Sequence, residues 1–187
     1  MNGNRVSGEI LLAIARAAIA RELGRETRAP EDAQWLFEPG ATFVTLRKEE
    51  LLRGCIGTLE AQRPLLQDVK ANAVSAAFKD PRFPPLVLDE LDATHVEVSL
   101  LSPLELISFE NEQHALSHVE PGLHGVSFEY GWHKSTFLPQ VWEELPDLHE
   151  FMGHLKQKAG LPPDFWDPEV KLSRYTVSKW SESSVRS

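Results

Sequence analysis

The sequence predicts an α+β fold built on antiparallel β-sheet, and three observations favour this class. Segments with strand-like patterns are joined by short turns, as in hairpins, and helical patterns occur between them at irregular intervals. The 187 residues, 42% of them hydrophobic, suit one domain with a sizeable core. Regular alternation of strand and helix is missing, which argues against a doubly wound parallel sheet.

The first half of the chain predicts a helix, a hairpin, a second helix and a single strand. Ser7 is a suitable N-cap for the first helix, and Gly24 follows its end. Prolines 81, 84 and 85 exclude a helix after the second one, because each removes a backbone donor. In order, the predicted elements are a helix over 7–23, a loop over 24–40, strands over 41–47 and 51–59 joined by a charged bend at 48–50, a helix from 64 to before 81, and an alternating strand over 94–101.

The second half predicts a hairpin between short helices and a final strand. Its elements are a short helix over 111–118, strands over 125–130 and 134–138 around a tight turn at 131–132, helices over 141–145 and 147–159, and a closing strand over 170–180. The polar residues 181–187 are interpreted as a frayed tail. No repeat or long linker divides the sequence, so we interpret 1–187 as one domain with a core over 7–180.

Composition narrows the function classes. The 28 acidic residues outnumber the 19 Lys and Arg, which gives a net charge of −9, so nucleic-acid binding is disfavoured by repulsion from the phosphates. The one cysteine, Cys55, excludes an internal disulfide and suits a reducing compartment. Neither a signal-peptide pattern nor a run of 18 apolar residues occurs, which predicts a cytoplasmic protein with no membrane span.

The most informative segment is Arg53-Gly54-Cys55-Ile56-Gly57. Glycines inside a strand often mark a bulge or a close approach by another backbone or a ligand. In a flat strand Arg53 and Cys55 would share one face, where the guanidinium would favour the reactive thiolate. One reading is therefore a reactive or ligating cysteine with Arg53 as an anion anchor. The other is that Cys55 is a small buried hydrophobe.

Two further segments could line a cleft together with Arg53 and Cys55. Asp80-Pro81-Arg82-Phe83 holds a carboxylate and a guanidinium two residues apart, either as a binding edge or as a salt bridge that fixes a loop. Glu97 and Ser99 lie on the polar side of their alternating strand. They are either cleft residues or an ordinary solvated face.

The histidines give no clear metal motif. His114 and His118 are four apart, as two ligands on one helix face would be, but the chain has neither a His-Glu-x-x-His string nor a cysteine pair. We therefore predict no dedicated metal site. Because phosphate-binding glycine loops are also missing, no cofactor is predicted. His124 and His133 are the histidines best placed to pair with Cys55.

Leu52-Arg53-Gly54-Cys55-Ile56-Gly57 resembles the signature hexapeptide of the AMMECR-one domain family. The resemblance runs from about Leu11 to Trp180 in the expected order. Its other matching segments are Asn72-Ala73, Asp80 to Pro85, Glu97 to Ser99, His124 to Val126, Thr136 to Trp142 and Lys158 to Leu161. The resemblance implies an antiparallel sheet with a smaller subdomain and a cleft near the hexapeptide.

Bacterial and archaeal relatives resemble protein A of the AmmeMemoRadiSam system, whose other members are a Memo protein and a radical S-adenosylmethionine enzyme. This resemblance names partners but no reaction. The leading hypothesis is an accessory or substrate-handling component of such a system, with a cleft around the hexapeptide. Its predicted site has Cys55 as the reactive or ligating group, Glu97 as polar orienter or proton acceptor, and Arg53, Arg82 and Gln140 as ligands for a small anionic substrate. The alternative is a non-catalytic protein interaction module in which the hexapeptide shapes the core.

Overall fold

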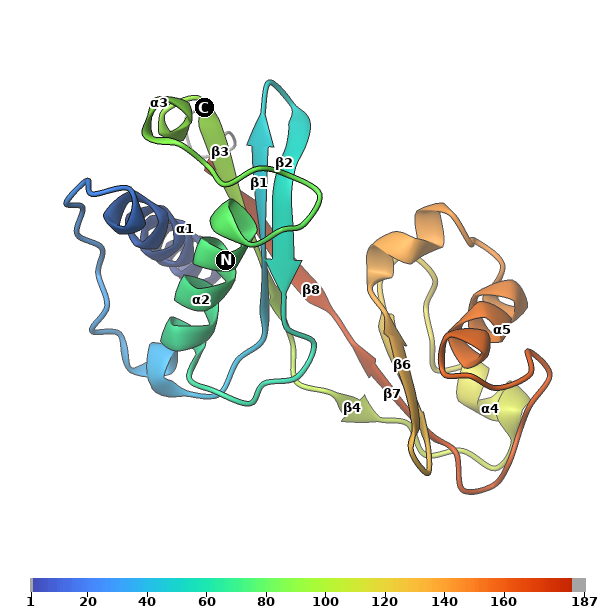
Figure 1. The fold of residues 1–187 in the computed structure, drawn as a ribbon. Coiled ribbons are helices and arrows are strands. Elements are labelled where there is room, and N and C mark those ends of the chain that lie inside the picture. Colours follow the sequence, from blue (N-terminus) through green and yellow to red (C-terminus); the bar gives the residue numbers. More distant parts are fainter. Residues whose placement is uncertain (1, 183–187) are drawn as a thin grey trace. The chain divides into compact units, whose positions relative to one another are not determined.

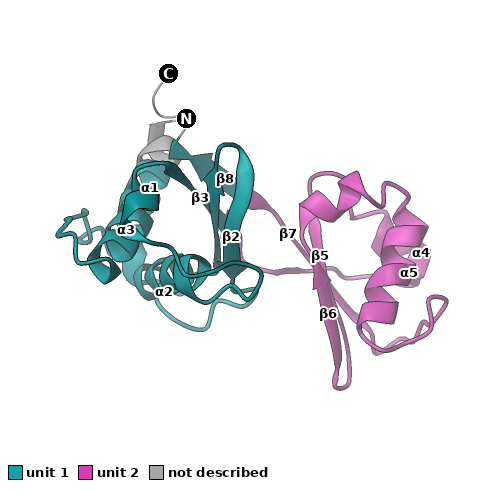
Figure 2. Cartoon of the chain, turned by 45° about the horizontal axis from the view of Figure 1, so that its top comes forward, with its two compact units in different colours: residues 1–101, 178–187 teal, residues 102–177 magenta. Residues whose placement is uncertain are grey.

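The computed structural model describes residues 2–182, with side chains from Ser7 onward, and the chain divides into two compact units. Unit 1 comprises residues 1–101 and 178–187, and unit 2 comprises residues 102–177 (Figure 2). Each unit contains helices and a four-stranded antiparallel sheet. The predicted α+β class, with a smaller second part, is confirmed.

Unit 1 is a helix-covered sheet with the strand order β2-β1-β3-β8 (Figure 1). Its elements are α1 (Asn2–Glu22), the 3-10 helix η1 (Gln34–Phe37), β1 (Thr42–Lys48), β2 (Leu51–Gly57), α2 (Leu65–Phe78), α3 (Leu88–Leu91), β3 (Thr94–Leu101) and β8 (Val177–Ser181). The alternating side chains of β1 and β3 place Val44, Leu46, Val96 and Val98 in the core, each 0% exposed. Helices α1 and α2 cover that face of the sheet.

Unit 2 has the strand order β4-β7-β5-β6 and a separate core. Its elements are β4 (Glu105–Leu106), α4 (Glu112–Leu116), β5 (Gly125–Tyr130), β6 (His133–Phe137), the 3-10 helix η2 (Pro139–Glu143), α5 (Leu148–Lys158) and β7 (Lys171–Tyr175). The Trp142 and Phe151 rings stack in this core with centroids 3.6 Å apart. Asp147 caps α5 by accepting hydrogen bonds from the N–H groups of His149 and Glu150.

The predicted closing strand over 170–180 is wrong in one respect. It is two strands, β7 in the sheet of unit 2 and β8 in the sheet of unit 1. The break falls at Thr176, whose backbone exchanges hydrogen bonds with Ser102: the Ser102 N–H donates to Thr176 O, and the Thr176 N–H donates to Ser102 Oγ. No glycine or proline lies between Lys171 and Ser181, so no turn signal in the sequence marks the break.

Other differences concern element ends and short elements. Helix α1 begins at Asn2, so Ser7 lies inside the helix and is not its N-cap. The predicted loop over 24–40 contains η1, and the predicted helix over 141–145 is the 3-10 helix η2. The short elements α3 and β4 were not predicted. Elements of four and two residues are too short for a periodic pattern to reveal them.

The extent of the domain stays a prediction. The predicted tail covers residues 181–187, and residues 183–187 lie outside the part of the chain that the structure describes. Within the described part of the chain, no helix is both long enough and apolar enough to cross a membrane.

Candidate functional site

Three residues of the predicted region lie side by side on one face of the unit 1 sheet. Thr45 of β1 is paired with Cys55 of β2 on one side and with Glu97 of β3 on the other. Directly opposed residues of antiparallel strands project to the same face. Because Val44 and Leu46 face the helices, Thr45, Cys55 and Glu97 face the other way. We call these three residues the thiol face.

The Cys55 side chain is half-buried, and the Thr45 hydroxyl donates a hydrogen bond to its Sγ at 3.2 Å. The backbone of Cys55 faces outward, because β2 is an edge strand. Its N–H donates to Asp80 Oδ2 at 2.8 Å, and its carbonyl accepts from Arg82 Nη2 at 3.3 Å. The Asp80–Phe83 loop therefore covers the sheet edge where the cysteine lies, as edge strands generally require.

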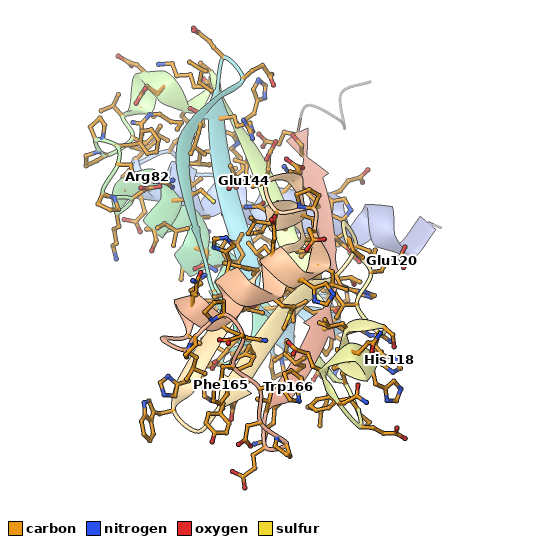
Figure 3. All side chains as sticks on the ribbon, turned by 90° about the vertical axis from the view of Figure 1, so that its right-hand side faces the viewer. Arg82, His118, Glu120, Glu144, Phe165 and Trp166 are labelled. Atoms are coloured by element: carbon orange, nitrogen blue, oxygen red, sulfur yellow. The ribbon has the colours of Figure 1, made fainter. Side chains whose placement is uncertain are left out.

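Asp80 and Arg82 form a two-pronged ion pair beside Cys55. Arg82 Nε donates to Asp80 Oδ1 at 2.9 Å, and Nη2 donates to Oδ2 at 2.7 Å. Asp80 is buried, whereas the side chain of Arg82, which is labelled in Figure 3, is more than half exposed. The hydrogen bonds from Arg82 hold the pKa of the Asp80 carboxyl well below its usual range, and the Cys55 N–H adds to this effect. Of the two readings of this segment, the structure shows the loop-fixing salt bridge.

Arg53 is the extra residue of a β-bulge. Leu46 is paired with Gly54 and Arg47 with Leu52, which leaves Arg53 without an opposite residue. The expectation from a flat strand therefore does not hold here. The Arg53 side chain is largely buried, and its Nη2 binds Glu90 Oε2 of α3 at 2.9 Å.

Glu90 receives a second cation, because Lys48 Nζ lies 3.0 Å from Glu90 Oε1. The hydrogen bonds from Arg53, and next those from Lys48, lower the pKa of Glu90 to about 2. The other terminal nitrogen of this guanidinium, Arg53 Nη1, is buried and has no hydrogen-bond partner among residues 2–182. Glu90 is thus the carboxylate that compensates the buried guanidinium.

Glu97 is held between two cations on the thiol face. Arg47 Nε lies 3.2 Å from Oε1, and Lys179 Nζ of β8 lies 2.8 Å from Oε2. Neighbouring strands lie about 4.8 Å apart, so the backbones of Cys55 and Glu97 are separated by about 10 Å, with Thr45 between them. Thr45 therefore separates Cys55 from Glu97 on this face.

Gln140, the fifth predicted site residue, lies on η2 in unit 2 and is exposed. His124 and His133 also belong to unit 2. His124 Nδ1 accepts a hydrogen bond from the Glu120 N–H at 2.9 Å, and His133 Nδ1 lies 2.8 Å from the carbonyl of Ala159. Both histidines are therefore engaged within their own unit. No group of three or more His, Cys, Asp or Glu side chains in the described part of the chain is arranged to hold a metal ion.

Sequence reasoning missed Thr45, Arg47 and Lys179. A two-residue hairpin turn without a bulge would place Thr45 opposite Gly54. The pairing of Thr45 with Cys55 depends on the bulge at Arg53, so the sequence could not show it. Lys179 could not be found, because its contact with Glu97 depends on β8 returning to the sheet of unit 1.

A buried polar network beside this sheet was also missed. Asp68 of α2 is 1% exposed and accepts hydrogen bonds from the Thr42 N–H and hydroxyl, the Thr58 hydroxyl and Arg63 Nε. Asn72 donates to Asp68 and to the Thr42 carbonyl. Because the carboxylate has so many donors, we assign the network a structural role: it joins α2 to the start of β1 and to the segment after β2.

A family model described as AMMECR1 matches residues 12–180, which include the hexapeptide, the Asp80–Phe83 loop and all three strands of the thiol face. The chain belongs to the AMMECR1 family. The resemblance found in the sequence is thereby confirmed.

Archaeal members of the AMMECR1 family are similar to this chain over nearly their whole length. A protein of Methanothermobacter thermautotrophicus is 41% identical over 184 residues, which cover 96% of each chain. Protein MJ0810 of Methanocaldococcus jannaschii is 40% identical, and the match covers 96% of this chain and 92% of the relative. The crystal structure of the uncharacterized protein PH0010 from Pyrococcus horikoshii matches with a TM-score of 0.75 at 38% identity, covering 94% of this chain and 91% of that one.

Proposed function

We propose that this AMMECR1 protein is a cytoplasmic, substrate-handling component of a modification system with a Memo-like protein and a radical S-adenosylmethionine enzyme. In this proposal the thiol face is the binding surface and Cys55 is its reactive or ligating group. The observation that carries the proposal is the position of the Cys55 sulfur. It lies on the sheet face opposite the hydrophobic core and accepts a hydrogen bond from Thr45.

The charges around the thiol face support an anionic substrate. Arg47 and Lys179 both contact Glu97, so two cations surround a single carboxylate. Arg82 lies beside Cys55 with its side chain 54% exposed, although Asp80 balances its charge. In this proposal a small anionic molecule lies over Thr45 and contacts Cys55. It takes Arg47 or Lys179 from Glu97 as its own cationic partner. Arg53 would then act indirectly, by fixing β2 to α3.

The test is co-purification of the full chain from its native host with the Memo-like and radical S-adenosylmethionine proteins, followed by analysis of bound small molecules. Cys55→Ser and Glu97→Gln should lower recovery of the bound molecule while the protein stays folded. Glu49→Gln, which changes an exposed carboxylate of the same unit, is the matched control. If Cys55→Ser and Glu97→Gln both retain the bound molecule and the two partners, the assignment of the site is wrong.

A second candidate function, the non-catalytic interaction module, is favoured by the two glycines of the hexapeptide. A Cβ at Gly54 would lie 2.1 Å from the carbonyl oxygen of Ala76, and one at Gly57 would lie 2.2 Å from the Phe43 ring. Both glycines are thus explained by packing alone. This candidate is supported if Cys55→Ser retains both partner proteins and no small molecule is recovered from the wild-type chain.

A further inference from the structure

His114 and His118 of unit 2 form a close pair on an exposed surface. His114 lies in α4 and His118 lies in the turn that follows it, and both side chains are exposed. Their Nε2 atoms are 3.3 Å apart, and the ring centroids are 5.1 Å apart. Figure 3 shows His118 and Glu120 on the same short segment after α4. Two neutral imidazoles at this separation share one hydrogen bond between their ring nitrogens.

The separation also fits a metal ion. Histidine nitrogens lie about 2.0–2.1 Å from a tetrahedral zinc ion, so two such ligands are about 3.3–3.4 Å apart. We propose that His114 and His118 form a two-histidine site for a borderline divalent cation such as Zn²⁺, with water in its remaining positions. Sequence spacing placed the two rings on one side of a helix, and the structure adds the separation of the nitrogens.

The backbone around the pair is fixed. The Asn111 side chain accepts a hydrogen bond from the His114 N–H at 2.9 Å and so caps α4. Arg174 Nη1 donates to the His118 carbonyl at 2.8 Å. The backbone at both histidines is therefore held in place, which reduces the ordering needed when an ion binds.

The charges nearby are mixed but favour a cation. Glu110 and Glu120 flank the pair in the sequence, and both side chains are exposed. The cations in the neighbourhood have carboxylate partners: Arg174 binds Glu105, and Lys156 binds Glu112. Coordination requires the His114 proton to move to Nδ1, because a neutral imidazole offers one lone pair. The 3.3 Å hydrogen bond from the Glu110 N–H to Nδ1 is lost in this tautomer, so the His114 ring must turn away from the Glu110 N–H as the ion binds.

The test is titration of the metal-free full chain with ZnCl₂ by calorimetry, and with CoCl₂ by absorbance. One ion should bind per chain. His114→Gln and His118→Gln should each lower the affinity at least about tenfold, since even the loss of an outer partner lowers metal affinity by roughly 10–100-fold. His149→Gln removes an exposed histidine of α5 and is the matched control. The proposal is overturned if binding does not saturate, or if either His114→Gln or His118→Gln binds like the wild type.

Discussion

At Gly54 the backbone of α2 approaches the sheet so closely that no side chain fits. A Cβ there would lie 2.1 Å from Ala76 O, a backbone atom that cannot move without shifting the helix. Gly57 is different, because the atoms above it belong to the Phe43 side chain, which has rotatable bonds. The two glycines of the hexapeptide are therefore not equivalent.

We expect Gly54→Ala to lower the free energy of unfolding by about 3 kcal/mol or more, since the clash forces a backbone shift in a packed core. Gly57→Ala should have a smaller effect, because the Phe43 ring can turn away. Urea denaturation of both variants measures the difference. Equal stability of Gly54→Ala and the wild type would contradict the close approach of α2.

A second residue-scale prediction concerns the turn between β1 and β2. Glu49 and Glu50 both have positive φ, 51° and 62°, a conformation that disfavours side chains with a Cβ. Glu50→Gly should raise the free energy of unfolding by up to about 1 kcal/mol. Glu50→Ala removes the same charge but keeps the Cβ, so thermal denaturation should show no gain for that variant. A gain of equal size in both would attribute the effect to charge.

Among the elements, α3 is short but anchors the bulged part of β2 through Glu90. Its four residues place one carboxylate against both Arg53 and Lys48. The pKa of Glu90 is lowered from 4.5 to about 2, so the folded state holds the ionised form. Its contribution to stability is fully present above pH 4.5 and is lost as the pH falls to about 2.

Glu90→Gln should accordingly flatten the loss of stability between about pH 4.5 and about pH 2, while lowering stability at neutral pH. Denaturant titrations at several pH values measure this slope. Glu49→Gln, on an exposed carboxylate, should leave the slope unchanged. An identical acid profile for Glu90→Gln and the wild type would show that the ion pair with Arg53 does not form.

In unit 2 the helices α4 and α5 are joined by a buried ammonium group. Lys156 is 2% exposed, its Nζ binds Glu112, and the Trp166 ring lies 5.6 Å away. Glu112→Ala should destabilise the protein by about 2 kcal/mol, because it leaves the buried charge without its carboxylate. The double variant with Lys156→Met should recover most of this loss. Additive effects in the double-mutant cycle would contradict the pairing.

For most elements the sequence predicted type and place, because their apolar periodicity matches the face they bury. The strand over 94–101 is reproduced to the residue, with Val96 and Val98 in the core. The candidate site was harder to predict. The bulge at Arg53 changes the direction of the Arg53 side chain from that in a flat strand. A bulge has no periodic pattern by which the sequence could reveal it. The partner of Arg53, Glu90, lies in a helix too short to detect.

For the whole molecule, the sequence pattern did not reveal the division into two units. The chain leaves unit 1 after Leu101 and returns at Ser178, which lies inside the predicted closing strand. The family, in contrast, could be predicted from the hexapeptide and the order of the other segments, and the match over residues 12–180 confirms it. Local motifs identify a family, whereas the pairing of distant strands sets the surroundings of Cys55.

The accessibility of the thiol face is tested most directly by the rate at which iodoacetamide modifies Cys55 in the native, metal-free protein at neutral pH. Because the sulfur lies on the thiol face and not in the core, we expect complete modification without denaturant. If Cys55 resists modification until the protein unfolds, the sulfur is inaccessible and the thiol face is not a binding surface.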